Sequence, residues 1–465
     1  MTARAPPAGD GFDAVVVGGG AAGVLVAIRL LSGDGPPPKV AIAEPAMRLG
    51  EGAAYSTRYP FHLLNVPAGR MSAIAGQPDH FLDFLERRHG GPRERIAGSF
   101  VARGEYARYL RATLDALPAR DALVHVRASA TGIERDGDGW RVALSTSQSL
   151  RARAVVLAIG NAPRPLPRFL LHPGVRVAEA WDYDAVAAIP ADADVCILGT
   201  GLSMVDAALV LGRAGRRGRI LALSRHGLAP LSHAAGHPPD PAPPDPWLAL
   251  GVRARLRLLR RLVAARAAKG EPWQWTLERL RPHGQALWRS LDPDQQRRFL
   301  RHAVRYWDIH RHRIAPEVAA AIATMRDEGR LELVAGRLRA VTAHPEGGSC
   351  IHFRPRRQQR EHMRRADWIV NASGVETGIE LRPGALLQAM RERGLVLPGR
   401  HGLGLACSAD GIVLDARARP QPGLYVIGAL RLGELWETIA VPELREQARE
   451  IAEAIHPGRA GASAG

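Results

Sequence analysis

The 465-residue sequence predicts an α/β protein with two parallel-sheet domains, the second inserted into the first and carrying a helical insertion. Three observations lead to this prediction. An apolar strand, a glycine-rich turn and an apolar helix follow one another twice, at residues 13–31 and 195–211. A small hairpin and an apolar strand ending in glycine also occur twice, at 139–160 and 350–374. Between 231 and 316, a proline-rich linker leads into long helical periodicity.

The first strand, turn and helix have the glycine spacing of a dinucleotide-binding loop. Gly18 permits a tight turn, Gly20 lets the backbone approach a pyrophosphate, and Gly23 lets the helix pack on the strand. The next apolar strand ends in Glu44, about 20 residues further on, where an acid can accept hydrogen bonds from a ribose. The alternative is a glycine-rich turn with a surface glutamate nearby.

The second unit repeats this pattern with two differences. Its turn contains Gly199, Gly201 and Ser203, but Met204 occupies the third glycine position, so a degenerate fold that binds no nucleotide is an alternative. The following strand ends at Arg225, where an NAD site usually has an acid. Because arginine can pair with a 2′-phosphate, the sequence favours NADPH over NADH, although surface arginines are common in this chain.

The repeated hairpin and strand indicate two Rossmann-like dinucleotide-binding domains, one inserted in the other. The chain is expected to leave the first domain near Gly160 and to return near Gly374. The predicted first domain is discontinuous and is assigned residues 1–165 and 335–465. Residues 166–334 form the predicted second domain, with its insertion at about 231–316.

The helical insertion has two interpretations. It interrupts a nucleotide domain and contains His302, His310 and His312, so it is a candidate lid over a cleft between the domains. The alternative is a packed helical buttress, since the tryptophans of this region are more typical of a core. Alternate histidines do not share a helix face, and no metal site is expected.

Cysteine usage and the N-terminus bear on the compartment. Cys196, Cys350 and Cys407 lie far apart without a CxxC pair, which disfavours a disulfide scaffold, a zinc site and a redox-active dithiol. The first residues lack a hydrophobic signal region, and glycines interrupt the apolar run at 14–31. We expect a cytoplasmic protein without a membrane span.

The formal net charge of +17 permits a nucleic-acid-binding interpretation. Nearly all of this charge is arginine spread along the chain, with Lys39 and Lys269 as the only lysines. The densest run, residues 253–266, has leucines at helical spacing and predicts an amphipathic helix with a solvated basic face, where an acidic partner remains an alternative. Nucleic-acid binding is not favoured, because no reading module or aromatic-basic sheet pattern is present.

With both glycine turns in place, the chain resembles the two-dinucleotide-binding-domain flavoproteins, and within them the bacterial FAD/NAD(P)-binding proteins. The resemblance covers nearly the whole chain. It implies FAD in the first site and NAD(P)H in the second. It is carried by residues 15–23, 61–72, 198–206, 306–316 and 435–445.

The resemblance also implies particular cofactor contacts. It places the FAD phosphates and ribose at the first glycine turn and the following acid, and it brings the Asn65 loop and Gly160 beside the cofactor. Residues 423–440 look like the closing flavoprotein motif, which brings a strand end and a helix N-terminus to the isoalloxazine edge. The implied FAD contacts are Gly18, Gly20, Ala21, Gly23, Glu44, Asn65, Gly160, Gly428, Trp436 and Thr438.

Departures from related families matter as well. Baeyer-Villiger and flavin-containing monooxygenases carry a histidine shortly before the tryptophan that corresponds to Trp181, whereas this chain has Ala178 there, which disfavours a Baeyer-Villiger reaction. Disulfide reductases need a CxxC pair. Ornithine and lysine N-hydroxylases share the two-site layout without sharing the segments around His310 and Trp436.

The expected function is an FAD-dependent oxidoreductase acting on a small-molecule substrate. NADPH, or alternatively NADH, would reduce the flavin, and oxygen or an organic acceptor would reoxidise it, with monooxygenation as one outcome. The alternative is a non-catalytic FAD- or nucleotide-binding sensor or scaffold. Catalytic residues, the substrate and the oligomeric state do not follow from the sequence.

Overall fold

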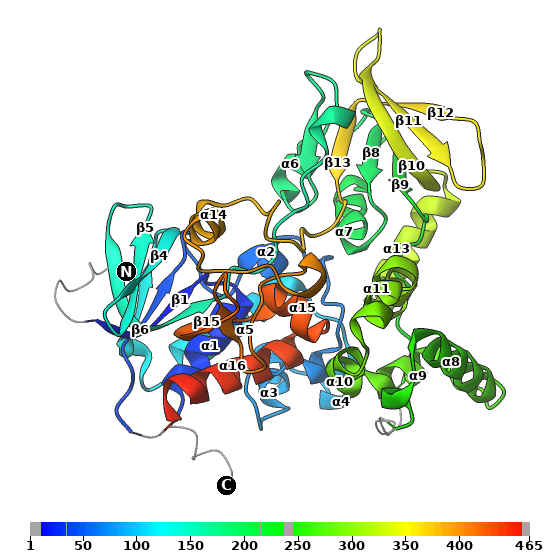
Figure 1. Ribbon diagram of the computed structural model, residues 1–465. Coiled ribbons are helices and arrows are strands. Elements are labelled where there is room, and N and C mark those ends of the chain that lie inside the picture. Colours follow the sequence, from blue (N-terminus) through cyan, green and yellow to red (C-terminus); the bar gives the residue numbers. More distant parts are fainter. Residues whose placement is uncertain (1–10, 34, 214, 237–244, 458–465) are drawn as a thin grey trace. The chain divides into compact units, whose positions relative to one another are not determined.

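The computed structural model describes residues 11–33, 35–213, 215–236 and 245–457. These form two compact units. Unit 1 comprises the described residues of Met1–Pro60, Val66–Ala162 and Glu376–Gly465, and unit 2 comprises Phe61–Asn65 and Pro163–Val375. The chain therefore passes from unit 1 into unit 2 and back, as Figure 1 shows by its colours.

Unit 1 is built on an eight-stranded sheet in the order β14-β15-β6-β1-β2-β3, with a β4–β5 hairpin attached to β6 through β5 (Figure 1). The pairs between β15, β6, β1, β2 and β3 are parallel. The strands are β1 Phe12–Val17, β2 Val40–Ala43, β3 Leu123–Val126, β4 Ala130–Asp136, β5 Gly139–Leu144, β6 Ser149–Leu157, β14 Ile412–Leu414 and β15 Pro420–Val426.

Helices cover this sheet. The buried helix α1 packs against α5 and α16, and α14 packs against β4. The helices are α1 Ala21–Leu31, α2 Gly52–Tyr55, α3 His80–His89, α4 Arg93–Gly98, α5 Arg103–Asp115, α14 Ala385–Glu392, α15 Leu432–Leu435 and α16 Val441–Ile455.

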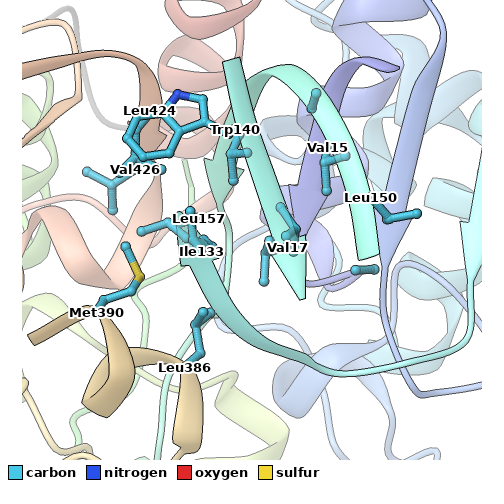
Figure 2. Close-up of a cluster of buried hydrophobic side chains, with 14 of the residues drawn as sticks. Val15, Val17, Ile133, Trp140, Leu150, Leu157, Leu386, Met390, Leu424 and Val426 are labelled. Atoms are coloured by element: carbon cyan, nitrogen blue, oxygen red, sulfur yellow. The ribbon is translucent and has the colours of Figure 1, made fainter. Parts of the chain in front are cut away.

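The core of unit 1 explains the sequence of β1. Because a parallel strand is covered on both faces, the residues of β1 from Ala14 to Val17 form a continuous apolar run. Val15 and Val17 share one face and join a cluster with Trp140 from β5 and Met390 from α14 (Figure 2). This packing holds the carboxyl end of β1, and with it the first glycine turn, in place.

Unit 2 is built on a seven-stranded sheet in the order β12-β11-β10-β9-β8-β13-β7 (Figure 1). The strands β7, β13, β8, β9 and β10 pair in parallel, and β10, β11 and β12 are antiparallel. They are β7 Val177–Glu179, β8 Val195–Leu198, β9 Ile220–Ser224, β10 Leu331–Ala343, β11 Ser349–Pro355, β12 His362–Ala366 and β13 Trp368–Asn371.

The structure corrects the domain boundary expected at residue 335. Leu331 at the start of β10 pairs with Ile220 of β9, and Ile369 of β13 pairs with Cys196 of β8. Residues 335–371 therefore complete the second sheet, and the chain returns to unit 1 only after Val375.

The helical insertion lies within unit 2. The side chain of Arg313 is buried, with 2% of its surface exposed, and it pairs with Glu278 of α9, which ties the end of the insertion to its middle. Residues 237–244 of the predicted proline-rich linker lie outside the described residues. The helices of unit 2 are α6 Tyr183–Ala187, α7 Leu202–Leu211, α8 Val252–Ala267, α9 Trp273–Leu280, α10 Gly284–Arg289, α11 Pro293–His302, α12 Val304–Arg311 and α13 Pro316–Asp327.

Candidate functional site: two glycine turns

The first glycine turn joins β1 to α1 and leaves no room for side chains at two positions. Gly18 has φ +104°, and a Cβ atom there would lie 2.4 Å from the carbonyl oxygen of Ala158. At Gly23 a Cβ atom would lie 2.0 Å from the carbonyl oxygen of Gly18. Glycine at these positions therefore lets the helix, the turn and the neighbouring strand approach closely.

The N-terminus of α1 is open to an anion. The helix begins after Gly20 with no side-chain cap and no acidic residue in its first turn. Its first N–H groups, beginning with that of Ala21, have no partner within the helix. A Cβ atom at Gly20 would meet only Gly52, at 3.5 Å. This end of the helix therefore suits a phosphate group.

Glu44 lies beside this turn. It follows β2, and its carboxylate accepts hydrogen bonds from the backbone N–H groups of Gly19 at 2.8 Å and Ala46 at 3.0 Å. The side chain is half-buried. Because an ionised carboxylate has about four acceptor positions, Glu44 can hold the turn and still accept from a ribose hydroxyl.

Gly160 follows β6 at the same edge of the sheet. It has φ +62°, and a Cβ atom built there meets no atom within 4 Å. Arg382 donates hydrogen bonds to the carbonyl oxygens of Ile159 at 3.1 Å and Gly160 at 2.6 Å. Burial lowers the pKa of Arg382 and nearby Glu376 opposes this shift. Sequence reasoning missed Arg382, because only the fold brings it to this strand end.

Gly428 and Thr438 are joined by a buried hydrogen-bond network at the end of β15. The Gly428 N–H donates to Gln447 Oε1 at 3.0 Å, and Thr438 Oγ1 donates to the Gly428 carbonyl at 3.0 Å. Gln447 Nε2 also donates to the Thr438 carbonyl at 3.0 Å. Sequence reasoning missed Gln447, which lies on α16. Its signal was helical spacing with the buried Leu444, Ala448 and Ile451.

Trp436 adopts a backbone conformation that side chains rarely take. Its φ is +61° and its ψ is −64°, at the end of α15. Such strain costs about 1–3 kcal/mol and persists where the surrounding structure enforces it. The conformation lies two residues before Thr438, within the segment that resembles a closing flavoprotein motif.

Asn65 belongs to the short segment that joins unit 2. A ring nitrogen of His233 contacts the Asn65 carbonyl at 3.0 Å, and a ring nitrogen of the buried His62 contacts the backbone carbonyl of Asp206 at 3.1 Å. The backbone of this segment is therefore held by the second unit. A contact between Asn65 and FAD stays a prediction.

The second glycine turn joins β8 to α7 in unit 2. Gly199 has φ +127°, and a Cβ atom there would lie 1.9 Å from the Ala372 carbonyl oxygen, whereas Gly201 faces open space. Helix α7 begins after Gly201 with no side-chain cap and no acidic residue in its first turn. Met204 is fully buried, so the local packing accommodates its side chain. The N-terminus of α7 therefore also suits a phosphate group.

Ser203 and Arg225 flank this second turn. The indole N–H of Trp181 donates to Ser203 Oγ at 3.0 Å. Arg225 is exposed just beyond β9 and forms no ion pair with another described residue. Partial burial of the guanidinium lowers the pKa of Arg225 below its ordinary value, and the charges of Arg305, Arg164 and Arg337 lower it further. The carboxyl end of β9 is thus strongly positive.

The histidines of the candidate lid lie on or beside the helices of the insertion. The His310 ring contacts Trp273 edge-on, with centroids 4.9 Å apart, and its Nδ1 lies 2.7 Å from the Tyr306 carbonyl. His302 is exposed on α11, and His312 follows α12. The candidate lid role of these histidines stays a prediction.

The cysteines are free and poorly suited to nucleophilic chemistry. Burial raises the pKa of Cys196 to about 12 and that of Cys407 to about 11, so both are thiols at neutral pH. Over the described part of the chain, no group of three or more His, Cys, Asp and Glu side chains is placed to hold a metal ion. Nor does any helix in that part have the length and apolarity needed to span a membrane.

The two strand-turn-helix units define a protein with two Rossmann-like domains. Residues 15–162 match the model of the FAD-NAD(P)-binding family. It contains the first glycine turn, Glu44 and Gly160. The predicted resemblance to FAD/NAD(P)-binding proteins is thereby confirmed.

Solved structures share the fold over nearly the whole chain. An ornithine N-hydroxylase from Kutzneria with reduced FAD, NADP⁺ and L-ornithine is 15% identical and has a TM-score of 0.67, with 96% of this chain and 99% of that chain covered. A cadaverine monooxygenase from Erwinia amylovora bound to FAD is 14% identical with a TM-score of 0.69, covering 97% and 96%. An ornithine hydroxylase from Pseudomonas aeruginosa is 16% identical with a TM-score of 0.64, covering 96% and 99%.

These similarities confirm the predicted α/β fold with two Rossmann-like domains. They also agree with the expectation that N-hydroxylases share the two-site layout. No curated protein matches the sequence significantly.

Proposed function

We propose that this chain is an FAD-dependent oxidoreductase in which NADPH reduces the flavin and oxygen or an organic acceptor reoxidises it. One observation carries the proposal. Two helices begin behind glycine turns without side-chain caps, and the first turn is followed by an acid whereas the second is followed by an arginine. This is the arrangement that two different dinucleotides require.

The first turn would hold FAD. Its phosphates would bind Gly18, Gly20, Ala21 and Gly23 at the N-terminus of α1, and Glu44 would accept from a ribose hydroxyl. The segments that end the neighbouring strands would support the remainder of the cofactor. The residues proposed there are Asn65, Gly160, Gly428, Trp436 and Thr438.

The second turn would hold NADPH. Gly199, Gly201 and Ser203 would contact the pyrophosphate at the N-terminus of α7, and Arg225 would pair with the 2′-phosphate that NADH lacks. Bound FAD would supply a hydride acceptor and a route for electrons to oxygen or an organic acceptor. The chain would bind and orient both nucleotides.

Among the possible reactions of the reduced flavin, monooxygenation of a small molecule is the first to test. The structural neighbours include hydroxylases and monooxygenases of ornithine, lysine and cadaverine, all of which carry a primary amine. These proteins share the fold of this chain at 14–16% sequence identity, so primary amines are the first substrates to test by experiment. A cytoplasmic location is part of the proposal and is supported by the three free cysteines.

The visible spectrum of the purified protein tests the proposal. We expect a yellow flavin spectrum that bleaches under anaerobic conditions with NADPH, and more slowly with NADH. A yellow protein that neither nucleotide bleaches would instead support a non-catalytic sensor or scaffold. A colourless protein that also fails to bind added FAD would overturn the assignment of the first site.

Measurements of oxygen consumption then distinguish monooxygenase activity from oxidase or reductase activity. NADPH-dependent oxygen uptake that rises with ornithine, lysine or cadaverine, while hydrogen peroxide stays low, would indicate monooxygenation of an amine. Uptake that ends entirely in hydrogen peroxide with every candidate would indicate an oxidase or reductase activity.

A further inference from the structure

More positive charge gathers at the carboxyl end of β9 than Arg225 alone provides. Ser224, the last residue of β9, pairs with Ala335 of β10, so Arg337 lies two residues further along the neighbouring strand. The backbone N–H of Arg356 donates to the Ala335 carbonyl at 2.8 Å, which brings the chain beyond β11 to the same place. Three separate segments of unit 2 thus deliver arginines to one strand end.

The helical insertion contributes to the same place through α12. The rings of His226 and Tyr306 have centroids 6.2 Å apart, and Arg305 precedes Tyr306 on this helix. Burial lowers the pKa of His226, and the positive charges of Arg356, Arg225 and Arg305 lower it further. Arg305 therefore lies close enough for its positive charge to influence the residues at the carboxyl end of β9. We call Arg225, Arg305, Arg337 and Arg356 the arginine cluster.

The arginine cluster has little compensating negative charge from the described part of the protein. Arg225, Arg337 and Arg356 form no ion pair there, and Arg305 pairs with Asp308 of its own helix at 3.1 Å. Like charges held close together repel one another, and an anion bound among them would relieve this repulsion. The cluster is thus suited to a ligand with more than one negative charge.

We propose that the helical insertion is part of the nucleotide site, with Arg305 of α12 joining Arg225, Arg337 and Arg356 around the 2′-phosphate of NADPH. This inference rests on the proposed function for the identity of the nucleotide. A phosphomonoester carries about 1.5–2 negative charges near neutral pH and three acceptor oxygens, so it can bind several guanidinium groups at once. The insertion then determines nucleotide specificity as well as supporting the domain.

The test compares two probes that differ by the 2′-phosphate. We would measure the affinities of the FAD-loaded full chain for 2′,5′-ADP and for 5′-AMP by calorimetry. We expect 2′,5′-ADP to bind more tightly. The substitution Arg305→Ala should weaken its binding about tenfold and leave 5′-AMP binding within twofold, because only the charge-assisted contacts to the phosphate are lost.

Matched variants separate this effect from a structural one. Arg301→Ala removes an exposed arginine of α11 in the same insertion and should change neither affinity. Arg305→Lys keeps the charge and should restore part of the loss. If Arg305→Ala lowers the melting temperature, Arg337→Ala provides a second test of the arginine cluster, because Arg337 lies on β10 instead of α12. If Arg305→Ala and Arg337→Ala both leave the 2′,5′-ADP affinity unchanged, the inference is overturned. It is also overturned if these variants lose affinity equally for 2′,5′-ADP and 5′-AMP.

Failure of the arginine-cluster inference can be distinguished from failure of the proposed oxidoreductase function. If 2′,5′-ADP binds in a manner that depends on Arg305 while NADPH leaves the flavin oxidised, the oxidoreductase proposal fails and the site stands. If 2′,5′-ADP binds no better than 5′-AMP while NADH bleaches the flavin, the oxidoreductase proposal stands and the arginine site fails.

Discussion

The Glu44 carboxylate accepts a hydrogen bond from the backbone N–H of Gly19 at 2.8 Å, so the acid at the end of β2 and the turn at the end of β1 are joined directly. This bond gives Glu44 two roles in the proposed site. The bond holds the turn in shape, and the remaining acceptor positions of the carboxylate are those proposed to bind a ribose hydroxyl.

Replacing Glu44 should therefore weaken FAD binding strongly. Hydrogen bonds to a charged group contribute about 1.5–3 kcal/mol, so Glu44→Ala should raise the FAD dissociation constant roughly tenfold to a hundredfold. Flavin fluorescence during titration of the apoprotein measures this. Glu94→Ala on the exposed surface of α4 is the control. A dissociation constant within twofold of the unaltered chain would remove Glu44 from the site.

The close packing at Gly23 predicts a stability effect. In Gly23→Ala the new methyl group would lie 2.0 Å from the Gly18 carbonyl oxygen, and this overlap outweighs the roughly 1 kcal/mol that alanine gains over glycine in a helix. We expect a net loss of about 1–3 kcal/mol in the free energy of unfolding, measured by urea denaturation of the apoprotein. Gly98→Ala at the end of α4, where a Cβ meets no atom within 4 Å, should not destabilise the chain.

A substitution at Gly201 should change nucleotide affinity in the second unit without changing the stability of the chain. A Cβ atom there faces open space and its φ of −86° suits any residue, so Gly201→Ala should leave the unfolding midpoint unchanged. The added methyl would stand between the backbone and the pyrophosphate, so NADPH affinity should fall about tenfold or more while FAD affinity is kept. Unaltered NADPH affinity would argue against nucleotide binding at this turn.

Two tyrosines with raised pKa values predict a loss of stability at high pH. Burial raises the pKa of both Tyr55 and Tyr109 to about 12, against about 10 in an unfolded chain. Between pH 10 and 12 the unfolded chain loses these protons first, so the free energy of unfolding should fall as pH rises through this window. Urea denaturation at several pH values measures the slope. Tyr55→Phe should make it shallower, and an identical slope would contradict the assignment to Tyr55.

The local parts of the candidate site could be predicted from sequence. Gly18, Gly23 and Glu44 contact neighbours that the strand-turn-helix pattern already places beside them, so their spacing was enough to predict the geometry of the turn. The same holds for Gly199, whose turn repeats the pattern. Met204 raised doubt about the second turn because spacing alone does not reveal whether the surrounding packing can adapt, and the structure buries it completely.

The remaining features depend on contacts across the fold. Arg337 and Arg356 come to the end of β9 only through the register of β9, β10 and β11, which no local pattern encodes. The boundary expected at residue 335 was wrong for a related reason. β10 begins parallel to β9 and then continues into an antiparallel hairpin, so the residues that follow position 335 still belong to the second sheet.

The pairing of β15 with β6 has a consequence for synthesis on the ribosome. Leu424 pairs with Val155, although the main segment of unit 2, Pro163–Val375, is translated between them. Unit 2 has its complete sheet once Asn371 has emerged, whereas the sheet of unit 1 must wait for Val426 with its apolar β6 edge uncovered. The nascent chain therefore finishes its domains in the reverse of the order in which it starts them, and a stalled chain would present that edge to chaperones.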